Sequence, residues 1–138
     1  MITALAPAVA AEHVGSTSVP GLAGKPTIDI AVGVENLALP PVAWSRMKKL
    51  GYHYGGDHGY PQHVFRKGEA VPWQFLVHVV EYDRAMWRDY LRFRDHLRTH
   101  PQDAARYADL KAALLAERGG WYSGRNKAQF IRPILDGE

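Results

Sequence analysis

The 138-residue sequence contains no cysteine. This absence excludes disulfide bridges, zinc–thiolate sites, iron–sulfur clusters and a cysteine nucleophile, so any metal must bind through oxygen or imidazole ligands. No apolar run reaches the ~20 residues that a membrane-spanning helix requires, and no membrane partner is expected. The small apolar residues from Ala4 to Ala10 lack a preceding basic region and are interrupted by Pro7, which argues against a secretory signal. We therefore expect a cytoplasmic protein.

The sequence also lacks a strong excess of charge of either sign. Lysine and arginine number 17 against 14 acidic residues, which gives a formal charge of +3 with histidine neutral. Such a mild surplus indicates general affinity for anions, whereas nucleic-acid binding requires a concentrated basic stripe and is not expected. The hydrophobic content of 46% is typical of a globular protein. Residues 1–138 are predicted to form a single domain, and no oligomeric state is predicted.

The first half of the sequence alternates apolar and polar residues with the period of a β-strand. The clearest strand, predicted at 27–34, carries branched apolar side chains on one face, namely Ile28, Ile30, Val32 and Val34. Further strands are predicted at 9–14, 63–66 and 73–81. A helix is predicted at 41–50, because Pro41 suits its start and Gly51 its end.

The second half has the apolar period of helices. The spacing of Met86, Tyr90, Phe93 and Leu97 predicts an amphipathic helix that begins near Arg84 and packs its aromatic residues in the core. Two more helices are predicted, from about Pro101 to Gly119 and over 126–135. Strands followed by helices predict an α+β fold: one mixed β-sheet with helices packed against a face and a helical C-terminal half.

A Gly-Ser turn joins the first two predicted strands. Gly15, Ser16 and Ser18 combine a glycine that permits close backbone approach with hydroxyl donors and a helix start, a combination that suits a phosphate group. Asp29 lies on the strand face opposite the Ile/Val stripe, where a carboxylate would escape burial and could hold Mg²⁺. The turn fits equally an ordinary capped helix start, and Asp29 fits a structural partner of Lys25.

The segment EHVGSTSVPGL at 12–22, followed by KPTIDI at 25–30, resembles the signature of the GrpB-like proteins. Further stretches match that family in order, including FRKG at 65–68, HVV at 78–80 and the helical segment at 87–98. The resemblance implies a nucleotidyltransferase-like fold, in which the Gly-Ser turn binds a nucleotide triphosphate and acidic residues on the following strands hold a divalent metal. GrpB-like domains also occur fused to dephospho-CoA kinase, which implies a connection to coenzyme A or nucleotides.

The resemblance implies specific site residues. Those predicted to bind phosphate or nucleotide are Gly15, Ser16, Ser18, Lys25, Arg66 and Lys127. Asp29 and His78 are the predicted catalytic and metal-binding residues, with Mg²⁺ or Mn²⁺ as cofactor and a nucleotide as ligand or substrate. The expected partner is therefore a small phosphate-containing molecule. Each residue also has an ordinary alternative: Arg66 suits a solvated sheet edge, Lys127 an exposed helix face and His78 a packed strand position.

One position departs from the pattern of an active nucleotidyltransferase. A second carboxylate two residues after the first would reach the same metal, but Ala31 occupies this position. His78 lies where a third acidic residue could fall, and imidazole suits Mn²⁺, Zn²⁺ or Ni²⁺ better than Mg²⁺. Two functions remain open: an enzyme of nucleotidyl-transfer or metal-assisted type acting on a small phosphorylated or acyl-type molecule, and a non-catalytic binding or accessory module for a nucleotide or CoA-related molecule.

Overall fold

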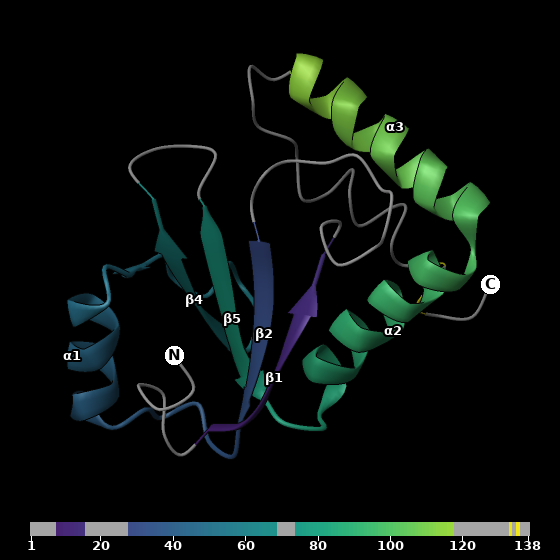
Figure 1. Cartoon of the computed structure of the whole chain (residues 1–138). Coiled ribbons are helices and arrows are strands. Elements are labelled where there is room, and N and C mark those ends of the chain that lie inside the picture. Colours follow the sequence, from purple (N-terminus) through teal and green to yellow (C-terminus); the bar gives the residue numbers. More distant parts are fainter. Residues whose placement is uncertain (1–7, 16–27, 69–73, 118–132, 134, 136–138) are drawn as a thin grey trace.

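The structure is a computed structural model and describes residues 8–15, 28–68, 74–117, 133 and 135. Within these residues, one five-stranded sheet is flanked by three helices (Figure 1). The strands are β1 (Ala8–Val14), β2 (Ile28–Val34), β3 (His53–Tyr54), β4 (Gln62–Lys67) and β5 (Phe75–Glu81). The helices are α1 (Pro41–Lys49), α2 (Ala85–Thr99) and α3 (Pro101–Glu117).

The sheet is mixed, with the strand order β1-β2-β5-β4-β3. Strands β2 and β5 pair in parallel at its centre, and every other neighbouring pair is antiparallel. This arrangement confirms the predicted α+β class and the mixed sheet. The predicted strands and the first three predicted helices appear within a few residues of their expected bounds. The short edge strand β3 was not predicted, and the helix expected at 126–135 lies outside the described residues except for positions 133 and 135, which are helical.

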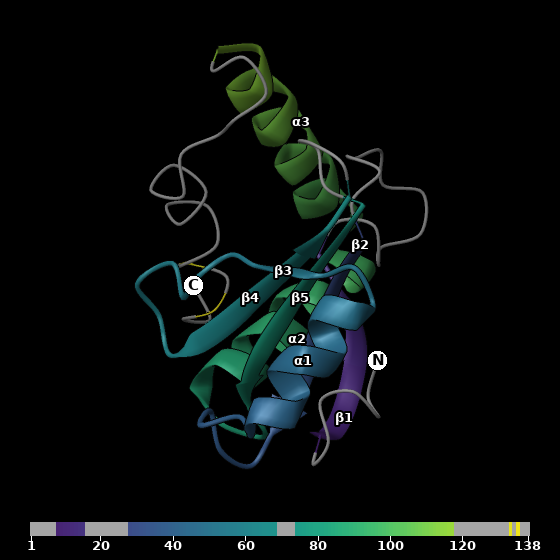
Figure 2. The ribbon, with the colours of Figure 1, turned by 90° about the vertical axis from the view of Figure 1, so that its left-hand side faces the viewer.

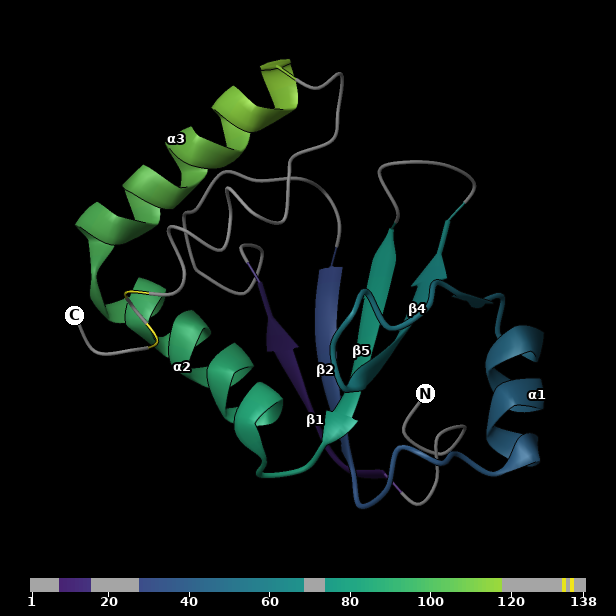
Figure 3. The ribbon, with the colours of Figure 1, turned by 180° about the vertical axis from the view of Figure 1, so that it is seen from behind.

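Helices cover both faces of the sheet, whereas the sequence predicted helices against one. Helix α1 packs Ala43 and Met47 into a cluster on the Ile/Val face of β2. Helix α2 packs Trp87 over the opposite face, against Ala31 and Val80. Figures 1 and 3 show α1 and α2 on opposite sides of the strands, and Figure 2 looks across α1 onto the sheet. The face that carries Asp29 is therefore largely covered, because its small and apolar residues accept a helix.

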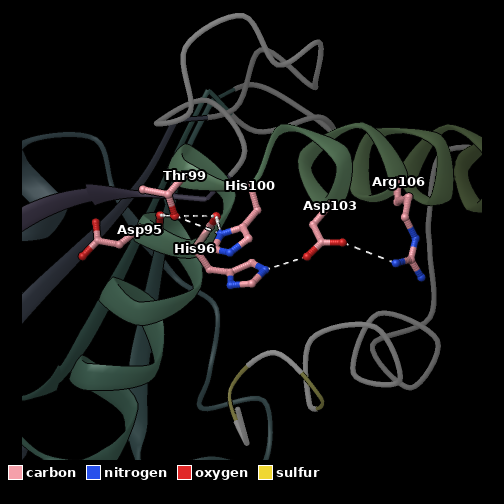
Figure 4. Close-up of polar contacts among 6 residues, drawn as sticks. All are labelled: Asp95, His96, Thr99, His100, Asp103 and Arg106. Atoms are coloured by element: carbon pink, nitrogen blue, oxygen red, sulfur yellow. Dashed lines mark hydrogen bonds and ion pairs between the residues drawn. The ribbon is translucent and has the colours of Figure 1, made fainter. Parts of the chain in front are cut away.

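Helices α2 and α3 meet at a tight corner that carries several polar contacts (Figure 4). His96 Nε2 lies 2.6 Å from Asp103 Oδ2, and the imidazole rings of His96 and His100 stack with centroids 3.9 Å apart. The hydrogen bond from His96 holds the pKa of the Asp103 carboxyl below its usual value, which outweighs the slight burial that would raise it. Beside this corner, Phe93 and Tyr107 join the two helices in a small apolar cluster.

Among the described helices, none combines the length and apolar character that crossing a membrane would need.

Candidate functional site

The register of the central strands brings Asp29 and His78 onto the same face of the sheet. Across the β2–β5 pair, Asp29 is opposite Leu76, and Ala31 is opposite His78. Residues that are directly opposite each other on paired strands share a face, and so do residues two positions apart on one strand. Asp29 is two positions from Ala31, so its side chain lies on the same face as that of His78. His78 Nε2 lies 3.1 Å from Asp29 Oδ1, within hydrogen-bonding distance. The two residues that the sequence analysis assigned to one metal site therefore lie side by side on neighbouring strands, whereas Ser16 lies outside the described residues.

The pair is partly buried. The side chain of Asp29 is 24% exposed and that of His78 is 13% exposed. Asp29 is thus the end of the pair that solvent or a ligand reaches more easily. A hydrogen bond between an imidazole and a carboxylate restricts the orientation of both groups, as in the histidine–carboxylate pairs of many enzyme sites.

Gly15 lies directly against the carboxylate of Asp29. Its φ of +76° falls in the left-handed region that favours glycine, and a β-carbon at this position would lie 2.6 Å from Asp29 Oδ2. Both the backbone conformation and the contact therefore exclude a larger residue. The sequence interpretation required this glycine for close approach to an anion, and the structure adds its close approach to Asp29.

Arg66 occupies the same row of the sheet as Asp29. Arg66 is opposite Leu76 across the β4–β5 pair, and Leu76 is opposite Asp29 across the β2–β5 pair. With neighbouring strands about 4.8 Å apart, the two backbones are about 10 Å from each other. The stem of Arg66 passes Gly55, where its Cδ would lie 3.6 Å from an added β-carbon. The other predicted phosphate-binding residues lie outside the described residues: Ser16, Ser18, Lys25 and Lys127.

Behind His78, the structure shows two polar residues that the sequence interpretation missed. The hydroxyl of Tyr90 lies 3.2 Å from His78 Nδ1 and 3.1 Å from Gln62 Oε1. Gln62, only 5% exposed, donates from Nε2 to the backbone carbonyl of Asp57 at 3.0 Å. Tyr90 was assigned to the core because it follows the apolar spacing of α2. The sequence signal that could have identified Tyr90 is its hydroxyl group, which lies on the otherwise apolar face of α2. This face packs on the side of the sheet that carries His78.

Comparison with known proteins identifies the family. The model of the family described as GrpB protein matches residues 1–136. The chain belongs to the GrpB family. It is 38% identical to a UPF0157 protein of Streptomyces coelicolor, and the match covers 85% of this chain and 61% of that protein. It is also 35% identical to the glutamate-rich protein GrpB of Alkalihalophilus pseudofirmus, and this match covers 91% of this chain and 76% of that protein. The crystal structure of the conserved protein GrpB from Enterococcus faecalis matches with a TM-score of 0.83 and 32% identity, over 99% of this chain and 84% of that one.

This GrpB chain spans less than two thirds of the length of several of its relatives. It covers 61% of the Streptomyces coelicolor protein, 48% of a UPF0157 protein of Pseudomonas aeruginosa and 32% of UPF0157 protein YqkA of Bacillus subtilis. The family predicted from the Gly-Ser signature is confirmed, and the α+β fold is that of a solved GrpB structure.

In this GrpB chain, Ala31 is completely buried. Its exposed fraction is 0%, and it packs in one cluster with Val14, Val80 and Trp87. The sequence interpretation treated this position as a missing metal ligand on an open strand face. The structure shows why a small apolar residue suits it: Trp87 of helix α2 covers the position, so a carboxylate there would be buried beneath this side chain, between Glu12 and His78 on the neighbouring strands.

The described residues contain one carboxylate–imidazole pair at the site and no group of three metal-ligating side chains there or elsewhere among them. Both ring nitrogens of His78 face protein groups, Nε2 facing Asp29 and Nδ1 facing Tyr90. A histidine that binds a metal must present a bare nitrogen to it. As arranged, His78 does not fit a metal ligand, whereas the Asp29 carboxylate has oxygens of the type that Mg²⁺ and Mn²⁺ bind.

Proposed function

We propose that this GrpB chain binds a small phosphate-containing molecule, a nucleotide or a coenzyme A-related compound, at the end of the sheet where Gly15 meets the Asp29–His78 pair. The observation that carries the proposal is the close approach of Gly15, the glycine of the Gly-Ser motif, to a partly exposed carboxylate that lies within hydrogen-bonding distance of an imidazole. A glycine with positive φ allows successive backbone N–H groups to point toward one anion.

The charges around the turn support a phosphate bound together with a divalent cation. A phosphate beside Asp29 alone would be repelled, whereas Mg²⁺ or Mn²⁺ between the two anions makes the contact favourable. Arg66, in the same row of the sheet, adds a positive charge of the kind that binds phosphate bidentately. On sequence grounds, Ser16, Ser18, Lys25 and Lys127 complete the set of phosphate-binding groups.

Under this proposal, each member of the pair has a separate role. His78 holds Oδ1 of Asp29 by a hydrogen bond, and Oδ2 lies on the side of Gly15. Asp29 is then the cation's protein ligand, and His78 orients it. A nucleotidyl-transfer enzyme and a non-catalytic accessory module would share this binding site and differ in whether a bound nucleotide reacts.

Calorimetric titration of the full chain tests the proposal. Inorganic phosphate, pyrophosphate, ATP, CTP and dephospho-CoA are titrated with and without Mn²⁺, into the wild type and into Asp29→Asn. With Mn²⁺, the substitution should weaken binding by about tenfold, because the cation loses a charged ligand. Without Mn²⁺, it should strengthen binding several-fold, because the repulsion between carboxylate and phosphate is removed.

The matched control is Asp109→Asn, which removes an exposed carboxylate from α3. It should leave binding unchanged with and without the cation. The proposal is wrong if none of the five compounds binds the wild type under either condition. It is also wrong if Asp29→Asn behaves like the control.

A further inference from the structure

A continuous line of hydrogen bonds runs from Asp29 back to the loop before β4. In order, it joins Asp29 Oδ1 to His78 Nε2, His78 Nδ1 to the Tyr90 hydroxyl, that hydroxyl to Gln62 Oε1, and Gln62 Nε2 to the Asp57 carbonyl. The donor–acceptor distances lie between 3.0 and 3.2 Å. The line draws on β2, β5, α2 and β4, so four elements that are separate in sequence converge on one carboxylate.

The Asp57 carbonyl, at one end of this line, determines which group donates in each hydrogen bond. The Asp57 carbonyl can only accept, so the Gln62 amide must turn its NH₂ toward it and its Oε1 toward Tyr90. A reversed amide would place two carbonyl oxygens against each other. Because Oε1 also can only accept, the single hydroxyl proton of Tyr90 goes to Gln62. The Tyr90 oxygen then accepts, and His78 must donate to it from Nδ1.

We propose that Gln62 and Tyr90 are positioning residues for the Asp29–His78 pair, which together keep a proton on His78 Nδ1. With Nδ1–H committed to Tyr90, the ring is held in one orientation, and Nε2 is directed at Asp29 Oδ1. The role of Gln62 and Tyr90 in ligand binding rests on the proposed function, whereas their hydrogen bonds are present in the chain without any ligand. Gln62 and Tyr90 thereby extend the site from the sheet end into the interface between sheet and α2.

The opposite face of the sheet supplies a matched control. There the hydroxyl of Tyr54 lies 3.0 Å from His63 Nδ1, and His63 Nε2 lies 2.7 Å from the Leu37 carbonyl. Tyr54 belongs to β3 and contacts Trp44 of α1, away from the Asp29 face. The substitutions Tyr90→Phe and Tyr54→Phe therefore each remove a tyrosine hydroxyl that lies against the Nδ1 of a histidine, one inside the proposed site and one outside it.

The experiment is ¹⁵N NMR of the histidine rings in the full, ligand-free chain, with His78 assigned through His78→Asn. In the wild type, Nδ1 of His78 should resonate as a protonated nitrogen. In Gln62→Met, the Tyr90 proton has lost its acceptor and should turn to His78, so Nδ1 should move to the unprotonated position. Tyr90→Phe should shift the His78 Nδ1 resonance, while Tyr54→Phe should shift only that of His63.

A purely packing role for Gln62 and Tyr90 would not move these resonances. The proposal is overturned if His78 Nδ1 is unprotonated in the wild type. It is also overturned if Tyr90→Phe, which keeps the ring volume, leaves the His78 nitrogens as Tyr54→Phe does. Should Gln62→Met fail to fold, as judged by circular dichroism, Tyr90→Phe still decides the outcome.

Nucleotide titration in the same variants separates this inference from the proposed function. Tyr90→Phe should weaken Mn²⁺–nucleotide binding by about three- to tenfold, the effect of one lost hydrogen bond that orients a ligand, and Tyr54→Phe should change it by less than about twofold. If the wild type binds no nucleotide, the proposed function fails and the ring resonances alone judge the positioning role. If the wild type binds but Tyr90→Phe changes neither resonance nor affinity, the positioning role fails and the proposed function stands.

Discussion

At the level of single residues, Gly15 combines two demands that only glycine meets. Its backbone adopts a positive φ, and its α-carbon leaves no room for a side chain beside Asp29. Gly59 has a similar φ of +81° but open space around it. A comparison of substitutions at the two glycines therefore distinguishes the effect of backbone strain from the effect of a steric clash with the carboxylate.

We predict that Gly15→Ala lowers the free energy of unfolding by about 1–3 kcal/mol more than Gly59→Ala does, because both gain the same backbone strain but only one gains a clash. Gly15→Ala should also weaken nucleotide binding, since Asp29 must move away from the added methyl group. Urea unfolding of both variants measures the difference. Equal destabilisation by the two substitutions would contradict the close contact with Asp29.

Ala31 shows the limit of what the sequence alone could predict about the site. The pairing of Asp29 with His78 was predictable, because strand alternation places each on the polar side of its strand. The environment of Ala31 was not, because its cover comes from Trp87, which is distant in sequence. The sequence analysis treated Ala31 as the place of a missing second metal-binding carboxylate, which assumed an open strand face.

We now predict that Ala31→Asp destabilises the chain by about 3 kcal/mol or more, because it buries a carboxylate beneath Trp87 and on the same strand face as the carboxylate of Asp29. The matched substitution Ala38→Asp, at an exposed position, should have little effect. Thermal unfolding of the two variants provides the comparison. A stable Ala31→Asp variant with raised Mn²⁺ affinity would contradict this prediction.

At the level of elements, the sequence predicted what local periodicity determines. Apolar alternation predicted the bounds of β2, and Pro41 and Gly51 predicted those of α1. The predicted and observed bounds agree within a few residues. The coverage of both sheet faces and the pairing of β3 depend on contacts between distant segments, which periodicity does not record. Tyr90 illustrates the limit, since its helical spacing correctly placed it facing the sheet but did not reveal that its hydroxyl meets His78.

The α2–α3 corner gives a prediction for the pH dependence of stability. Because the folded state lowers the pKa of Asp103, this carboxyl stabilises the fold above its ordinary pKa of about 3.9, and the contribution is lost as the pH falls through the lower folded value. Asp103→Asn should therefore lower the melting temperature by a few degrees at pH 6 and by progressively less below pH 4.

Melting temperatures of the wild type and of Asp103→Asn, measured between pH 2.5 and pH 7, test this expectation. Asp109→Asn, on the exposed side of the same helix, serves as the control. A constant difference between wild type and Asp103→Asn across this range would show that the Asp103 carboxyl does not stabilise the corner through its charge.

For the whole molecule, family membership and fold do not by themselves define a reaction. The sequence predicted the GrpB family from the long run around the Gly-Ser turn, which is specific, together with further stretches that match the family in order. The reaction depends on how many charged ligands converge on one place. The described part of the chain offers Asp29 there as its carboxylate, with His78 engaged on both ring nitrogens.

We predict that Mg²⁺-dependent nucleotidyl transfer is absent or very slow, because one carboxylate can anchor a metal–triphosphate complex but is poorly suited to hold the second metal that activates an acceptor. Pyrophosphate release from all four nucleoside triphosphates, over a panel of acceptors, measures it. Turnover on the order of 1 s⁻¹ that disappears in Asp29→Ala would establish an enzyme instead.

The parallel pairing of β2 with β5 has a consequence for the order of folding. Strands β1 and β2, and likewise β4 and β5, are sequence neighbours that can pair early, whereas the contact of Asp29 with His78 joins residues 49 positions apart. Bringing distant segments together is the slower event, because the entropy of closing the intervening loop is lost before the contact forms. An intermediate with both antiparallel pairs formed would still lack the carboxylate–imidazole pair, so acquisition of ligand binding would report the docking of the two halves of the sheet.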